Sequence, residues 1–243
     1  MLQSIRQLYG TKLGASDGHI GHIKDFYFDD RKWVVRYVVV DTGNWIPGRL
    51  VLISPHAFGS LYADGGILLV NLTRQQIESS PPIESHKPVS RQFEEDYYRH
   101  YGWPSYWHGG EVWGVGGFPV APPFAPPSSQ TMADGKGDGN EAPHLRSTQT
   151  LGGYQIQNVE GTIGQVVDFM MDDKSWVIRE IVVETGHWLS KKKIVMPANH
   201  IGRISYDESK LFVDVTNDAI QQGAEYQIPP LGAGYHDTRG FDD

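Results

Sequence analysis

The sequence repeats itself at a constant offset of 143 residues. One copy begins at Gly18 with GHIGHIKDFYFDDRKWVVRYVVVDTGNW, and the other begins at Gly161 with GTIGQVVDFMMDDKSWVIREIVVETGHW. The alignment continues without a gap to Glu78 and Gln221, and about a third of the paired residues are identical. This spacing far exceeds the roughly 20–50 residues of a solenoid repeat. We therefore predict two copies of one domain, each with its own core, at residues 1–80 and 151–225, with a connector at 81–150 and an irregular tail at 226–243.

Each copy has the pattern of an all-β domain. Gly21–Phe28 and Trp33–Val40 are rich in β-branched and aromatic residues, and the polar residues 29–32 between them suit a hairpin loop. Both faces of Trp33–Val40 are apolar, which favours a small closed barrel over a one-sided sheet. We expect further strands at 49–53, 67–71, 193–196 and 211–215, and short closing helices at 73–79 and 216–222.

The repeated pattern resembles the PRC-barrel domain. In the first copy the resemblance is carried by Gly18, Ile20, Gly21, Asp25, Phe26, Asp29, Asp30, Trp33, Val34, Arg36, Val39, Val40, Thr42 and Gly43, and the second copy repeats it from Gly161 to Gly186. The resemblance implies a small β-barrel that serves as a docking module, as in the photosynthetic reaction-centre H subunit and a ribosome maturation factor. The expected fold is therefore all-β, with two PRC-like barrels in tandem and a mostly irregular connector that contains one short helix.

Composition excludes several classes of function. A net charge of −8 opposes a general binder of nucleic acid or anionic membranes, because phosphate attraction requires a positive surface. The absence of cysteine removes disulfides, thiolate catalysis and cysteine-based zinc sites. No stretch approaches the roughly 18–20 uncharged apolar residues of a membrane span. We expect a cytoplasmic bacterial protein.

The most informative charged residues are predicted to form two cross-strand pairs. If residues 29–32 form the hairpin loop, Asp25 lies opposite Arg36, and the second copy repeats the pair as Asp168 and Arg179. Such a pair can fix strand register, and the alternative is a carboxylate–guanidinium ligand site. Because the pair occurs in both copies beside core positions, we favour the structural role.

The remaining polar patterns do not predict a catalytic, cofactor or metal site. The doublets Asp29–Asp30 and Asp172–Asp173 suit turns, and they lack the spacing of a calcium loop. His19 and His22 should point to opposite faces of a strand. No nucleophile elbow, phosphate-binding loop or dinucleotide fingerprint is present. We predict no enzyme activity, no cofactor and no metal.

The connector carries a dense group of aromatic residues. Ser90 is placed to cap a short helix at 91–101. Ten aromatic side chains lie between Phe93 and Phe124 in a Gly- and Pro-rich frame, and residues 127–148 read as a flexible linker. One interpretation is packing against a barrel, and the other is a partner-binding surface. The candidates for partner binding are Tyr97, Tyr98, Tyr101, Trp103, Tyr106, Trp107 and Trp113.

The sequence favours a non-enzymatic adaptor that docks a protein partner. The first alternative is a ribosome- or RNA-associated assembly factor, although the acidic charge opposes direct binding of nucleic acid. The second alternative is a small-ligand-binding protein that uses a cleft between the barrels. The sequence leaves open whether the chain forms a homo-oligomer.

Overall fold

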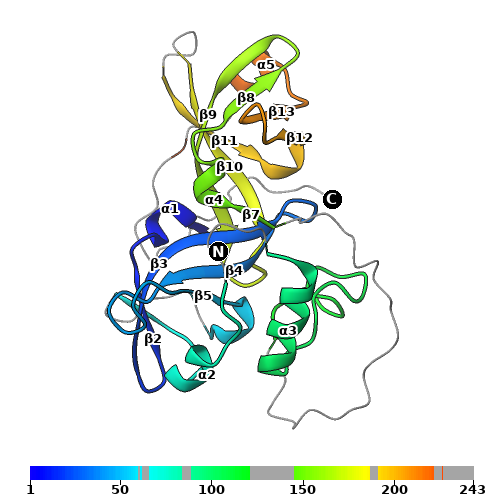
Figure 1. Cartoon of the computed structure of the whole chain (residues 1–243). Coiled ribbons are helices and arrows are strands. Elements are labelled where there is room, and N and C mark those ends of the chain that lie inside the picture. Colours follow the sequence, from blue (N-terminus) through cyan, green and yellow to red (C-terminus); the bar gives the residue numbers. More distant parts are fainter. Residues whose placement is uncertain are drawn as a thin grey trace. The chain divides into compact units, whose positions relative to one another are not determined.

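The computed structural model describes residues 1–59, 61, 66–83, 89–120, 145–186, 191–221 and 226. These residues form two β-sheets and several short helices (Figure 1). They fall into two compact units. We call them the first-copy unit, which contains the described residues of 10–145 together with 174–176, and the second-copy unit, which contains residues 1–9, 146–173 and the described residues from Val177 onward.

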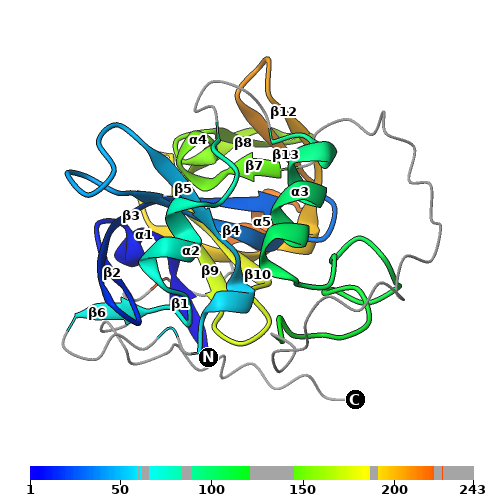
Figure 2. The same cartoon turned by 60° about the horizontal axis from the view of Figure 1, so that its bottom comes forward.

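The sheet of the first-copy unit has the strand order β5-β4-β3-β2-β6, and β7 pairs with β3. The pairs β2–β3, β3–β4 and β4–β5 are antiparallel, and β2–β6 is parallel. The strands are β2 (Lys12–Ala15), β3 (Gly18–Asp29), β4 (Val34–Asp41), β5 (Leu50–Ile53), β6 (Ile67–Leu69) and β7 (Leu145–Ser147), of which only Leu145 falls within the first-copy unit. The helices are η1 (Pro55–Ala57), α2 (Arg74–Glu78) and α3 (Arg91–Tyr101), and α3 lies beside β4 and β5 (Figure 2).

The sheet of the second-copy unit has the order β11-β10-β9-β8-β13-β12, and β1 pairs with β9. Its strands are β1 (Leu2–Ser4), β8 (Gln155–Asn158), β9 (Gly161–Asp172), β10 (Ile178–Thr185), β11 (Lys193–Pro197), β12 (Ile201–Ser205) and β13 (Lys210–Val213). Its helices are α1 (Ile5–Leu8), α4 (Thr148–Leu151), η3 (Ala198–His200) and α5 (Asn217–Gln221). The strands and closing helices expected from the sequence are thus confirmed, with shifts of one to three residues at their ends.

The two units repeat the same topology at the offset of 143. The parallel pair joins Lys12 to Ile67 in one unit and Gln155 to Lys210 in the other. Gly21 and Gly164 both approach backbone so closely that an added Cβ would lie 2.0 Å from Asp41 O and 2.1 Å from Glu184 O, respectively. Glycine at this position of the repeat is therefore a packing requirement.

The described strands of each sheet are arranged in an open order, without a pair that joins the first strand to the last. The expected all-β character is therefore seen as a mostly β fold with two sheets. Closure of either sheet into a barrel is not seen among the described strands. In the first-copy unit, the apolar character of both faces of β4 has another physical reason. Tyr37 of β4 packs against Tyr97 of α3, with ring centroids 5.2 Å apart.

The units depart from the expected domain boundaries in two places. Residues 1–9 group with the second copy, because β1 pairs with β9. The described residues of 89–120 belong to the first-copy unit and do not form a separate connector. Residues 127–144 of the expected flexible linker lie outside the described residues, whereas 145–148 form β7 and begin α4. The tail expected at 226–243 also lies outside them, apart from Tyr226.

Candidate interaction site

Helix α3 is held on the first-copy sheet through two tyrosines. The helix begins after Ser90, whose Oγ accepts from Phe93 N–H at 3.2 Å, as the sequence predicts. Tyr97 and Tyr98 are 1% and 2% exposed. The Tyr97 hydroxyl accepts from Ser54 N–H at 2.9 Å and donates to Leu52 O at 3.0 Å. These bonds tie the helix to the backbone of β5 and of the residue that follows it.

Glu94 joins the strand, the helix and the loop that follows the helix. Its Oε1 accepts from the hydroxyls of Tyr37 at 3.0 Å and Tyr106 at 2.6 Å, and its Oε2 accepts from Arg91 Nη1 at 2.9 Å. Burial raises the pKa of Glu94, and the bond from Tyr106 and the charge of Arg91 oppose that rise. A buried carboxylate that accepts three hydrogen bonds stabilises the packing of the strand, the helix and the loop that donate them.

Arg36 of β4 is completely buried beneath the same loop. Its guanidinium carbon lies 3.8 Å from the ring centroid of Tyr106 and 4.8 Å from that of Trp113. Its Nη1 donates to Val112 O at 2.7 Å, and its Nη2 lies 3.3 Å from Asp29 Oδ2. A cation enclosed by two aromatic faces, a carbonyl and a carboxylate is well stabilised despite its loss of water.

His56 of η1 completes the buried polar group. Its Nδ1 lies 3.0 Å from Ser54 Oγ, and its ring stacks on Trp103 with centroids 5.5 Å apart. Burial and the nearby charge of Arg36 lower the pKa of His56 to about 4, so the imidazole is neutral at physiological pH. We call Arg36, Ser54, His56, Glu94 and Tyr106 the buried polar group.

The loop at residues 102–120 is fixed by contacts along its length. Lys32 Nζ donates to Glu111 O at 3.0 Å, and Trp113 Nε1 donates to Ser175 O at 2.8 Å. Gly109 packs on the carbonyl of Gly114, where an added Cβ would lie 2.2 Å from the oxygen. The loop is therefore held in place as part of the first-copy unit.

This fixed loop presents apolar side chains to solvent. Val115, Phe118 and Val120 are 91%, 56% and 67% exposed, and the half-buried Trp107 follows the same helix. Arg91 lies over the Trp107 ring, with its guanidinium carbon 4.4 Å from the centroid. We call Val115, Phe118 and Val120 the loop surface. An exposed apolar group on an ordered loop is typical of a protein contact site.

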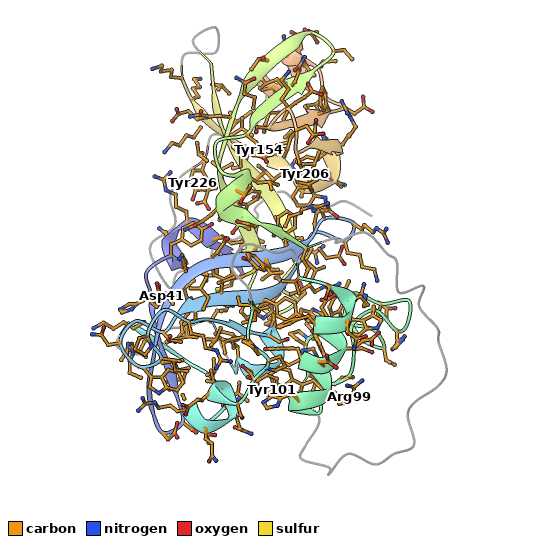
Figure 3. The ribbon with its side chains drawn as sticks, viewed as in Figure 1. Asp41, Arg99, Tyr101, Tyr154, Tyr206 and Tyr226 are labelled. Atoms are coloured by element: carbon orange, nitrogen blue, oxygen red, sulfur yellow. The ribbon has the colours of Figure 1, made fainter. Side chains whose placement is uncertain are left out.

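The seven aromatic residues predicted as partner contacts divide into two groups. Tyr97, Tyr98, Tyr106 and Trp113 are buried within the first-copy unit, so the prediction that they contact a partner is wrong. Their planar rings fill the space between the sheet and α3, which corresponds to the packing interpretation. Tyr101, Trp103 and Trp107 are half-buried, and Figure 3 labels Tyr101 near the C-terminal end of α3. Phe124 lies outside the described residues.

The predicted pair of Asp25 and Arg36 is also wrong. Asp25 lies opposite Val39, and Arg36 is paired with Asp29. The hairpin loop occupies residues 30–33, with Trp33 at φ 54°, and β3 and β4 contain register shifts at Ile23/Asp25 and Tyr27/Phe28. Each bulge moves the register by one residue, which a count from the loop cannot anticipate.

The predicted pair of Asp168 and Arg179 fails for the same reason. Asp168 lies opposite Val182, and Arg179 is exposed at a register shift between Ile178 and Glu180. Asp168 instead accepts bonds from Ser4 Oγ at 2.5 Å, Arg6 N–H at 2.9 Å, Phe169 N–H at 2.7 Å and the Tyr226 hydroxyl at 3.4 Å. Burial raises the pKa of Asp168, whereas the bonds from Ser4, Arg6 and Phe169 lower it.

A cavity of about 340 Å³ lies within the second-copy unit. Its lining includes Arg6, Tyr9, Gln149, Gln165 and Asp168. The Asp168 oxygens already accept four hydrogen bonds, so this carboxylate is engaged in the fold. Among the residues that the structure describes, no three His, Asp or Glu side chains are grouped to hold a metal ion. Within the same residues, no helix is both long and apolar enough to cross a bilayer.

Compared with protein-family models, the chain matches the PRC-barrel domain at residues 147–220. A PRC-barrel domain is thus present in the second copy. The search against curated proteins gives no match.

Sequence reasoning missed Glu94, Ser54 and His56. One signal for Glu94 was available, since it lies three and four residues before Tyr97 and Tyr98 and therefore shares their helix face. A carboxylate on an aromatic helix face indicates a buried partner. Ser54 and His56 gave no comparable signal, because their partners come from a helix about 40 residues away in the chain.

Proposed function

We propose that this protein is a non-enzymatic adaptor that binds a protein partner through the loop surface. The observation that carries the proposal is the exposure of Val115, Phe118 and Val120 on a loop that is anchored by the bond from Arg36 to the Val112 carbonyl and by the bond from Trp113 to the Ser175 carbonyl. Because the loop is already ordered, binding there costs little conformational entropy. The presence of a PRC-barrel domain, a module that often takes part in protein interactions, supports the proposal.

We also propose that the chain is a tandem of two PRC-like domains. The positions that the repeat offset relates to the matched segment 147–220 are residues 4–77. Apart from β12, which has no counterpart among the described strands of the first copy, both segments contain the same order of strands and the same parallel pair. The first copy would then also be a PRC-like domain, with α3 and the loop surface as an addition that the second copy lacks.

The loop surface can be tested by capturing partners from the native host with paired variants. The variant Val115→Asp/Phe118→Asp should lose a protein that the unchanged chain retains, since charge on the surface opposes apolar contact. The control is Leu69→Asp/Val159→Asp, which alters side chains that are 59% and 97% exposed elsewhere. Retention of every captured protein by the loop variant would refute the proposal.

The same capture separates the adaptor from a ribosome-associated factor. The acidic chain suits docking on a basic ribosomal protein better than direct contact with RNA. Co-sedimentation with ribosomal subunits that persists in the loop variant would favour that second function. Co-sedimentation that the loop variant abolishes would identify the partner as ribosomal.

A further inference from the structure

We propose that the second-copy unit contains a binding groove for an extended segment, and that this groove accepts residues 1–9 of a second copy of the chain as it accepts the chain's own. The proposal is independent of the loop surface, which belongs to the other unit. The groove runs along β9 and includes Asp168.

Backbone pairing is the first element of recognition. Leu2, Gln3 and Ser4 lie antiparallel to Asp172, Met171 and Met170, respectively, so the segment is held as an added strand. Strand addition of this kind takes its affinity from main-chain bonds and its specificity from alternate side chains.

Apolar side chains give the segment its specificity. Leu2, Ile5 and Leu8 are 9%, 0% and 5% exposed. Leu2 enters a core cluster with Met170 and Val182. Burial of three such side chains removes a large apolar area from water, which is the main source of affinity for a short segment.

Asp168 recognises the turn that follows the strand. It accepts from Ser4 Oγ and from Arg6 N–H, and Ser4 Oγ accepts from Gln7 N–H at 3.1 Å as the cap of α1. The buried carboxylate therefore binds both the hydroxyl of residue 4 and a backbone N–H at the beginning of the helix. An empty groove would leave this carboxylate without these two donors.

The chain connects the segment to the rest of the molecule in a way that permits exchange. After Tyr9 the chain enters the first-copy unit at Gly10, which has φ 76° and open space where a Cβ would lie. Strand β1 therefore precedes the first copy in the sequence but pairs within the second-copy unit, and a terminal strand of this kind can be exchanged between chains.

The same contacts form whether the donor is the same chain or another. Intramolecular binding dominates in dilute solution, because the segment and β9 belong to one chain, whereas binding to a second copy depends on the chain concentration. An exchanged dimer should therefore increase when the chain is refolded at high concentration.

The experiment uses two full-length chains with one cysteine each, Gln3→Cys and Met171→Cys. Because the unchanged chain has no cysteine, any disulfide between chains must involve the introduced residues. The two positions lie directly opposite each other. The chains are refolded together under oxidising glutathione at increasing concentration, and crosslinks are mapped by peptide mass spectrometry. The control replaces Met171→Cys by Phe28→Cys, the same repeat position in the first copy.

The expected result is a covalent heterodimer through positions 3 and 171 whose yield rises with concentration and is several-fold above that of the control. Absence of this heterodimer, or an equal yield with Phe28→Cys, would overturn the proposal. Circular dichroism in reductant verifies that each chain folds. If a buried cysteine prevents folding, the opposed pair Leu2→Cys and Asp172→Cys, with Lys24→Cys at an exposed position of β3 as control, gives the same test.

Discussion

Arg36 and Arg179 occupy the same position of the repeat and have opposite environments. Arg36 is fully buried among Asp29, Tyr106 and Trp113, whereas Arg179 is exposed. The difference arises because the first copy carries α3 and its loop above this position. The pair therefore offers a matched test of what the buried contacts contribute.

Arg36→Ala should lower the free energy of unfolding by about 3–5 kcal/mol, because it removes a buried cation and leaves Asp29 and the Val112 carbonyl without their partner. Arg179→Ala should change it by less than about 0.5 kcal/mol, as is usual at an exposed site. Urea denaturation followed by tryptophan fluorescence measures both. Equal losses for the two variants would contradict the assigned role of Arg36.

His56 gives the fold a specific sensitivity to acid. Its folded-state pKa of about 4 lies below the ordinary value of 6.5, so between these values the unfolded chain takes up a proton that the folded chain does not. Stability is therefore lost as pH falls through that window, by up to about 1.4 kcal/mol per pH unit. Glu94 has a raised pKa and acts in the opposite direction, since its contribution is lost as pH rises.

The variant His56→Asn installs the residue that the second copy has at this position, Asn199. Both proteins retain Glu94, so their difference isolates His56. Denaturation at pH 7 and pH 5 should show a smaller loss of stability for the variant than for the unchanged chain. A loss of the same size in both would show that another group titrates in this range.

At the scale of elements, the loop after α3 depends on two close backbone approaches. Gly114 has φ 80°, and an added Cβ would lie 2.7 Å from His108 O and 2.9 Å from Ser105 O. Gly110 lies in the same loop with nothing within 4 Å of the corresponding point. The loop surface depends on the first of these glycines and not on the second.

Gly114→Ala should therefore loosen the loop, with faster proteolysis between residues 102 and 120 and a weaker near-ultraviolet signal from Trp113. Gly110→Ala should behave as the unchanged chain. Limited proteolysis with mass mapping distinguishes the two. Equal cleavage rates would show that the loop tolerates a side chain at Gly114.

Sequence patterns predicted the elements better than their contacts. The Ser90 cap was enough to place the start of α3, and runs of β-branched and aromatic residues between polar segments were enough to place the strands. The partners of Asp25 and Arg36 could not be derived, because the hairpin loop lies at residues 30–33 instead of 29–32, and the register shift at Tyr27/Phe28 then moves Asp25 one residue further, to Val39. The contacts of α3 depend on residues 37 to 56, and no local pattern links such distant positions.

At the scale of the whole molecule, the repeat does not divide the chain into two continuous domains. Residues 1–9 complete the second-copy unit, and residues 174–176 from the second copy belong to the first-copy unit. Val35 N–H donates to Trp176 O at 2.9 Å, which anchors that short insertion. Cutting the chain between the copies should therefore leave both fragments incomplete.

The most direct test of this organisation is a pair of cysteine variants in single chains. Gln3→Cys/Met171→Cys places thiols on opposed residues of β1 and β9, and Gln3→Cys/Phe28→Cys places them at the equivalent position of the first copy. In dilute solution under oxidising conditions, we predict an intramolecular disulfide in the first variant and not in the second, as measured by peptide mass spectrometry. A disulfide in the Phe28 variant and none in the Met171 variant would show that the first strand remains with its own copy, and would contradict the account.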